Sequence, residues 1–61
     1  MILDIIDSYI YSLKGLPISK TLKRVATQEF IASLNRKSII PNDLYDDIMT
    51  YAMERIDAEN P

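Results

Sequence analysis

Residues 33–48 read SLNRKSIIPNDLYDDI, and this stretch separates two segments with helical patterns. Arg36 and Lys37 are typical of the last turn of a helix, where cations interact favourably with the negative end of the helix dipole. Pro41 is typical of a helix start, and the three aspartates that follow it in residues 43–47 suit the positive end of a dipole. The stretch therefore predicts that one helix ends near residue 35 and that another begins at residue 42 or 43, where Asn42 can serve as the cap.

The helix predicted for residues 42–57 has an unusually wide apolar surface, about 200° of its circumference where a surface helix needs about 100°. One stripe consists of Leu44, Ile48, Tyr51, Ala52 and Ile56, and a second stripe beside it consists of Tyr45, Met49 and Met53. Either this helix is central and contacts both others, or the second stripe faces outward. Tyrosine and methionine are enriched at protein interfaces. The candidate partner-interface residues are therefore Ile39, Ile40, Tyr45, Met49 and Met53.

Ile39 and Ile40 need a separate explanation, because the short connector that contains them has no local reason to be apolar. Either the core of the protein covers these two side chains or a partner does. The pre-proline position also favours an extended backbone here, so a short strand at residues 38–40 is conceivable from the sequence.

Residues 2–14 have the periodicity of an amphipathic helix, with apolar residues on one side and the aspartates in the first turns. Gly15 is expected to adopt the left-handed conformation that ends a helix, and Pro17 prevents continuation. In that arrangement Tyr11 and Leu16 would contact each other across a Schellman cap.

A middle helix is predicted for residues 20–35, with Ser19 as its N-cap. Its apolar residues form a row with a spacing of four, which drifts around the helix by about 40° per step. The row consists of Ile18, Leu22, Ala26, Phe30 and Leu34, with Ile31 well to one side. Glu29 lies at the edge of this apolar arc, and the sequence leaves open whether it is exposed or is buried with a basic partner.

The sequence predicts that the whole chain, residues 1–61, forms a single all-α domain, either a small three-helix bundle or a helical hairpin with a third helix. A chain this short buries only about 60% of the surface that its unfolded form exposes. It has no cysteine for disulfides and no histidine for the usual zinc chemistry. We therefore expect dimerisation or a protein partner to complete the fold.

Residue types argue against an enzyme, because the commonest general base, histidine, and the best nucleophile, cysteine, are missing. Gly15 is the only glycine, which rules out glycine-rich phosphate loops. The acidic cluster of Asp43, Asp46 and Asp47 occupies dipole-favourable positions and lacks the pattern of a calcium loop. We expect no catalytic residue, no cofactor and no metal ligand.

Charge is segregated along the chain. Residues 14–37 contain six basic residues and only one acidic residue, Glu29, whereas residues 38–61 contain six acidic residues and only Arg55 as a base. A basic middle helix favours contact with phosphates, although the sequence pI of about 4.8 argues against a strongly basic footprint. The alternative interpretation is that the basic helix packs beside the acidic one. The nucleic-acid candidates are Lys20, Lys23, Arg24, Arg36 and Lys37.

Two segments resemble parts of known families without matching their decisive residues. Residues 32–41 are similar to the small helical antitoxins that inhibit Fic-domain enzymes, but Lys37 stands where their inhibitory glutamate lies. Residues 39–48 resemble the strand-to-helix entry of ribbon-helix-helix repressors, which continue into a further helix. Neither resemblance assigns the chain to a family.

The leading hypothesis is a small non-enzymatic regulatory or adaptor protein, of the kind represented by inhibitors, antitoxins and anti-repressors, which acts by binding another protein or itself. The alternatives are a dimeric nucleic-acid-binding protein and a structural subunit of a larger assembly. The absence of cysteine, a start unlike that of a signal peptide, and apolar stretches far shorter than the roughly 18 residues of a membrane span lead us to expect a cytoplasmic protein without a membrane partner.

Overall fold

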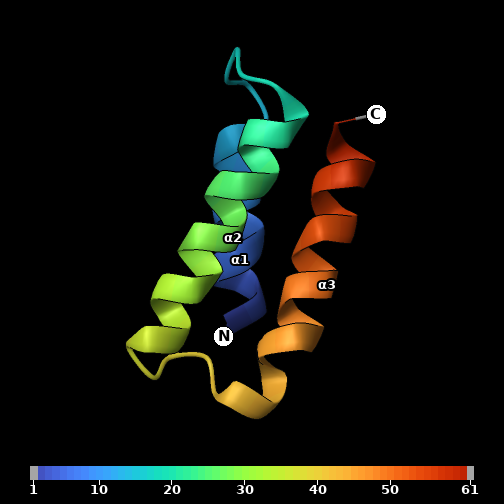
Figure 1. The fold of residues 1–61 in the computed structure, drawn as a ribbon. Coiled ribbons are helices and arrows are strands. Elements are labelled where there is room, and N and C mark those ends of the chain that lie inside the picture. Colours follow the sequence, from blue (N-terminus) through green and yellow to red (C-terminus); the bar gives the residue numbers. More distant parts are fainter. Residues whose placement is uncertain (1, 61) are drawn as a thin grey trace.

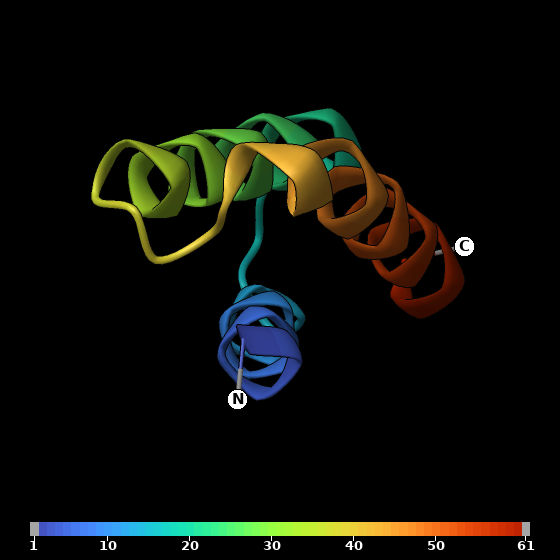
Figure 2. The ribbon, with the colours of Figure 1, turned by 90° about the horizontal axis from the view of Figure 1, so that it is seen from below.

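The computed structural model describes residues 2–60, which form three helices joined by two short loops (Figure 1). The helices are α1 (Ile2–Leu13), α2 (Lys20–Arg36) and α3 (Asn42–Glu59). Consecutive helices are antiparallel, so α1 and α3 run in the same direction. Figure 2 shows α2 and α3 side by side, with α1 beneath both. The all-α, three-helix prediction is confirmed, and the helix ends differ from the predicted ones by at most two residues.

The core lies where the three helices meet and consists almost entirely of isoleucine and leucine. Its members are Ile6, Ile10 and Leu13 of α1, Ile31 and Leu34 of α2, Ile40 of the second loop, and Ile48, Ala52 and Ile56 of α3. In α1 the buried positions recur every three or four residues, as the sequence pattern predicted. Each fully buried side chain of this size contributes about 1.5–3 kcal/mol to folding.

The first half of α2 turns a different face to the core from the one that its apolar residues indicated. Leu22 of the predicted row is 55% exposed, whereas its neighbour Lys23 is only 5% exposed. Thr27 is completely buried, and its hydroxyl donates to the Lys23 carbonyl oxygen at 2.8 Å. Ile31, which was expected well to one side, is also completely buried. The predicted row is wrong here because α2 buries polar side chains whose hydrogen bonds are satisfied within the chain.

The end of α1 does not have the Schellman cap predicted for it. Gly15 does not adopt a positive φ angle. Instead, the Lys14 N–H donates to the Tyr11 carbonyl oxygen at 3.1 Å, and the Leu16 N–H donates to the Leu13 carbonyl oxygen at 3.1 Å. Tyr11 is 71% exposed, so it does not form the apolar contact expected of that cap. This helix therefore ends in a tight turn whose hydrogen bonds join residues three apart, and the turn does not require a glycine at position 15.

The Schellman geometry occurs at the end of α2, with Ser38 at the left-handed position (φ 62°). The Ser38 N–H donates to the Asn35 carbonyl oxygen at 3.0 Å, and the Ile39 N–H donates to the Leu34 carbonyl oxygen at 2.9 Å. These are the two hydrogen bonds that define the motif. The cap reverses the chain so that Ile40 is completely buried while Ile39 stays 44% exposed. The two isoleucines thus have different environments, and residues 38–40 form no strand.

The starts of α2 and α3 are capped differently. Ser19 accepts a hydrogen bond from the backbone N–H three residues later at 3.1 Å, which confirms it as an N-cap. Asn42 does not cap α3: Pro41 is the N-cap residue and makes no side-chain cap, and the Asn42 side-chain oxygen accepts from Asn35 Nδ2 at 2.8 Å. Asn35 Nδ2 also donates to the Ile40 carbonyl oxygen at 2.9 Å. One amide group of α2 therefore holds the loop that leads into α3.

Candidate protein-interaction groove

An apolar groove of about 750 Å³ lies between the first turns of α1 and the first half of α3. We call it the α1–α3 groove, and its lining consists of Ile2, Leu3, Asp4, Leu44, Asp47, Ile48 and Tyr51. Ile48 is buried and partly buried Ile2 packs against the core, so these two form the floor. Leu3 is 46% exposed on the α1 wall and Leu44 is 43% exposed on the α3 wall. The groove therefore presents two half-exposed leucines above an apolar floor.

The polar residues of the groove are acidic. Asp4 belongs to the α1 wall and Asp47 to the α3 wall, and none of the residues within 2–60 that line the groove is basic. Asp4 directly follows Leu3, and Asp47 lies three residues, or about one turn, after Leu44. The apolar surface is therefore bordered by carboxylates on both sides.

A polar cluster closes the groove at its inner end. The Tyr51 hydroxyl of α3 donates to Asp7 Oδ1 of α1 at 2.8 Å. Arg55 Nε lies 3.6 Å from the same carboxylate oxygen, and Arg55 also bonds Glu59 Oε1 through Nη2 at 3.1 Å. The hydrogen bond to Asp7 raises the pKa of Tyr51, since the phenol must keep its proton to donate. These contacts hold α1 and α3 together beyond the last apolar residue of the groove.

The predicted interface residues do not form one exposed patch. Ile40 belongs to the core of the protein itself, while Ile39 is half-exposed on the second loop. Tyr45, Met49 and Met53 are partly buried and pack against the core. Their spacing of four residues puts them on one side of α3. Gln28 Nε2 of α2 donates to Met53 Sδ at 3.6 Å, which places that side against α2. That these residues bind a partner stays a prediction.

The wide apolar surface of α3 is thus used on two sides, one toward α2 and one toward α1. The sequence reasoning missed Leu3 and Leu44 as site residues, although both belonged to recognised apolar stripes. The available signal was the excess width of the α3 stripe, which left its outer edge uncovered at Leu44.

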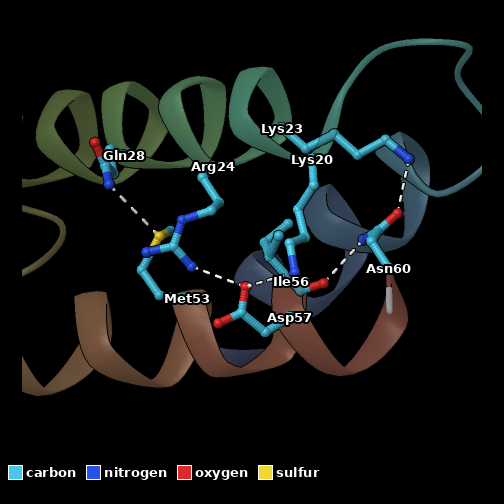
Figure 3. A network of polar contacts seen from close by, with 8 residues as sticks. All are labelled: Lys20, Lys23, Arg24, Gln28, Met53, Ile56, Asp57 and Asn60. Atoms are coloured by element: carbon cyan, nitrogen blue, oxygen red, sulfur yellow. Dashed lines mark hydrogen bonds and ion pairs between the residues drawn. The ribbon is translucent and has the colours of Figure 1, made fainter.

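Three of the five nucleic-acid candidates make contacts within the chain at or just beyond the end of α3 (Figure 3). Lys20 Nζ and Arg24 Nη1 lie 3.7 Å and 2.9 Å from Asp57 Oδ1. Lys23 Nζ donates to Asn60 Oδ1 at 2.7 Å and to the Lys14 carbonyl oxygen at 3.3 Å, which ties together the ends of all three helices. The basic start of α2 therefore packs beside the acidic end of α3.

The remaining charged candidates are solvent-exposed. Arg36 and Lys37 are exposed at the end of α2, and Glu29 is exposed on its outer surface. Within residues 2–60, no group of three or more acidic side chains is close enough to hold a metal ion, so the aspartates at the start of α3 do not form such a cluster.

Further exposed apolar side chains lie outside the groove lining. They are Leu16 and Ile18 in the first loop, Leu22 and Val25 of α2, Ile5 and Tyr11 of α1, and Ile39 of the second loop. They give the groove a useful internal comparison, because Leu16 and Leu22 are exposed to a similar extent as Leu3 and Leu44 but lie outside the groove lining.

Comparison of the chain with protein families, with curated proteins and with solved structures finds no match. Among the helices of residues 2–60, none combines the length and apolar character needed to cross a membrane.

Proposed function

We propose that this protein is a small, non-enzymatic regulatory or adaptor protein that acts by binding another protein through the α1–α3 groove. The observation that carries the proposal is the pair of half-exposed leucines, Leu3 and Leu44, above an apolar floor. Exposure of an apolar surface of this kind to water is unfavourable, and covering it with a partner lowers the free energy. The small core gives a second reason for association, since a partner adds the burial that the chain cannot supply alone.

The proposal is tested by site-specific photo-crosslinking in the cell of origin. A photoreactive phenylalanine analogue replaces Leu44 in the groove and, as a matched control, Leu22 on the outer surface of α2. We expect a protein adduct from position 44 and a much weaker one from position 22. An adduct with twice the mass of the chain would identify the protein itself as the partner and would support homodimerisation. Equal adducts from both positions, or none from either, would contradict the assignment to the groove.

Binding to nucleic acid is a weaker second candidate. Arg36 and Lys37 support it, because both are exposed at the end of α2. The burial of Lys23 counts against it, because its ammonium group is held within the chain by Asn60, whereas the exposed ion pairs of Lys20 and Arg24 with Asp57 are weak and count for little. An electrophoretic shift assay at low salt tests this candidate, and a complex that disappears in the double variant Arg36→Glu/Lys37→Glu would support it.

A structural subunit of a larger assembly is a further possibility within the same binding class. It predicts co-purification at a fixed stoichiometry, whereas a regulatory partner is expected to exchange. Native mass spectrometry of the affinity-purified protein separates these two forms of association.

A further inference from the structure

We propose that the occupant of the α1–α3 groove is an amphipathic helix of a partner protein whose apolar face is flanked by lysine or arginine. This inference rests on the proposed function and adds the chemical class of the partner to it. Three properties of the groove lead to it: its length, its walls and its charge.

The length of the groove matches two turns of a helix. Its lining on α3 extends from Leu44 to Tyr51, a separation of seven residues or about 10 Å along the helix axis. Beyond Tyr51 the hydrogen bond to Asp7 closes it. On a bound helix, apolar side chains at positions i, i+4 and i+7 span the same distance of about 10 Å. Three such side chains therefore match the open part of the groove.

The walls favour a helix over an extended strand. Both walls are helices that run in the same direction, and residues 2–60 contain no sheet edge to which a strand could add backbone hydrogen bonds. A helix satisfies its own backbone groups and needs only apolar contacts from the groove. Leu3 on one wall and Leu44 on the other would then contact the two sides of its apolar face.

The charge of the groove selects a basic helix. Asp4 and Asp47 lie on opposite walls, and Asp43 and Asp46 are exposed on the same turns of α3 as Leu44 and Asp47. Arg55, beyond the closed end, already pairs with Asp7 and Glu59. Basic residues that flank the apolar face would meet these carboxylates at the rim, as charged residues flank the apolar seam of a coiled coil. An acidic helix would be repelled by the carboxylates of the α3 wall.

A pair of synthetic peptides tests this inference by fluorescence anisotropy. Each peptide is about 14 residues long, roughly four helical turns, with leucines at positions i, i+4 and i+7. One carries lysine at the flanking positions, and the other carries glutamate at the same positions. We expect the lysine peptide to bind and the glutamate peptide not to bind.

The groove is located with matched leucine variants. The double variant Leu3→Ser/Leu44→Ser is expected to weaken binding of the lysine peptide by about thirtyfold, because two half-exposed leucines lose their contact with it. The double variant Leu16→Ser/Leu22→Ser removes the same chemical groups outside the groove and is expected to leave the affinity unchanged. Circular dichroism of each variant verifies that it is folded. Equal weakening by both double variants would overturn the placement in the groove.

The charge contribution is measured separately. Asp47→Asn is expected to weaken the lysine peptide by about threefold at low salt, with the difference disappearing at high salt as the charges are screened. Asp46→Asn, on the same helix but outside the lining, is expected to have a smaller effect.

If the glutamate peptide binds as tightly as the lysine peptide, and both depend on Leu3 and Leu44, the basic-partner inference fails while the proposed function stands. If neither peptide binds, the inference fails, and crosslinking at position 44 then decides the proposed function independently. If the free protein instead forms a dimer that Leu3→Ser/Leu44→Ser dissociates, a second copy is the occupant and the inference is overturned.

Discussion

The only glycine of the chain and its only described non-glycine residue with a positive φ angle lie at different helix ends. Gly15 has an ordinary backbone conformation, and a Cβ atom added to it would meet nothing within 4 Å. Ser38, by contrast, holds a φ of 62° at the end of α2. We therefore predict that alanine at position 15 and glycine at position 38 each stabilise the protein.

The size of each effect follows from the backbone. At Gly15, alanine fits without strain and reduces the entropy of the unfolded chain, which stabilises the fold by about 0.4–1 kcal/mol. At Ser38, glycine removes a left-handed strain of about 1–2 kcal/mol but adds unfolded-chain entropy that costs about 0.5–1 kcal/mol. The net gain for Ser38→Gly is about 0.5–1 kcal/mol. Gly15 lies in the loop before α2 and Ser38 lies just after its end, so the gains are expected to add in Gly15→Ala/Ser38→Gly.

Urea denaturation followed by circular dichroism measures these changes. For a domain of this size, a gain of 1 kcal/mol corresponds to a rise in Tm of about 4–8 °C. Lys37→Gly is the matched control, because Lys37 is adjacent to Ser38 but has a φ of −86°. The Lys37→Gly variant has the higher unfolded-chain entropy of glycine without any relief of strain, so it should be destabilised. A destabilised Gly15→Ala, or a Ser38→Gly variant no more stable than Lys37→Gly, would refute the assignment of the left-handed residue.

Two further predictions concern the loop before α3 and the polar cluster at the end of the groove. Ile40→Asp places a carboxylate in the core and should cost about 3–5 kcal/mol, enough to unfold much of the protein, whereas Ile39→Asp should cost less than about 1 kcal/mol in the same denaturation assay. Equal losses would mean that both side chains are covered. For Tyr51, the raised pKa means that its hydrogen bond to Asp7 contributes stability below about pH 10, the ordinary tyrosine value, and that this contribution is lost as the pH rises through the higher folded value. Tyr51→Phe should therefore reduce the loss of stability at alkaline pH, and Tyr11→Phe, at an exposed position without this bond, should not; similar pH profiles for the two variants would contradict the role of Asp7.

The helices were predictable because their ends depend on local chemistry. Ser19 caps α2, and the stretch from Arg36 to Pro41 ends one helix and begins the next, as the residue types indicated. The αL position was not predictable in this way, because glycine is the usual signal for it and the chain places serine there. Local preference was outweighed by the need to turn the chain and bury Ile40.

The faces of the helices were harder to predict because they depend on which neighbour covers them. In α2 the more apolar Leu22 is exposed and Lys23 is buried, a choice that becomes favourable only because Asn60 and the Lys14 carbonyl oxygen lie within reach of its ammonium group. Both partners come from other parts of the chain. The periodicity of one helix holds no information about such partners, so Leu3 could not be separated from the core residues of its own helix, and only the excess width of the α3 stripe pointed to Leu44.

The arrangement of the helices explains why segregated charge in the sequence leaves an acidic groove in the fold. Since α2 is antiparallel to α3, its basic start meets the end of α3, where Lys20 and Arg24 bond Asp57. The start of α3 faces α1 across the groove instead, and α1 contributes Asp4 there rather than a base. Charge neutralisation within the chain is thus concentrated at one end of α3, and the carboxylates at its other end border the exposed leucines. A basic partner helix would neutralise the second end as α2 neutralises the first, which is the physical reason to expect the apolar contact and the charge selectivity at the same site.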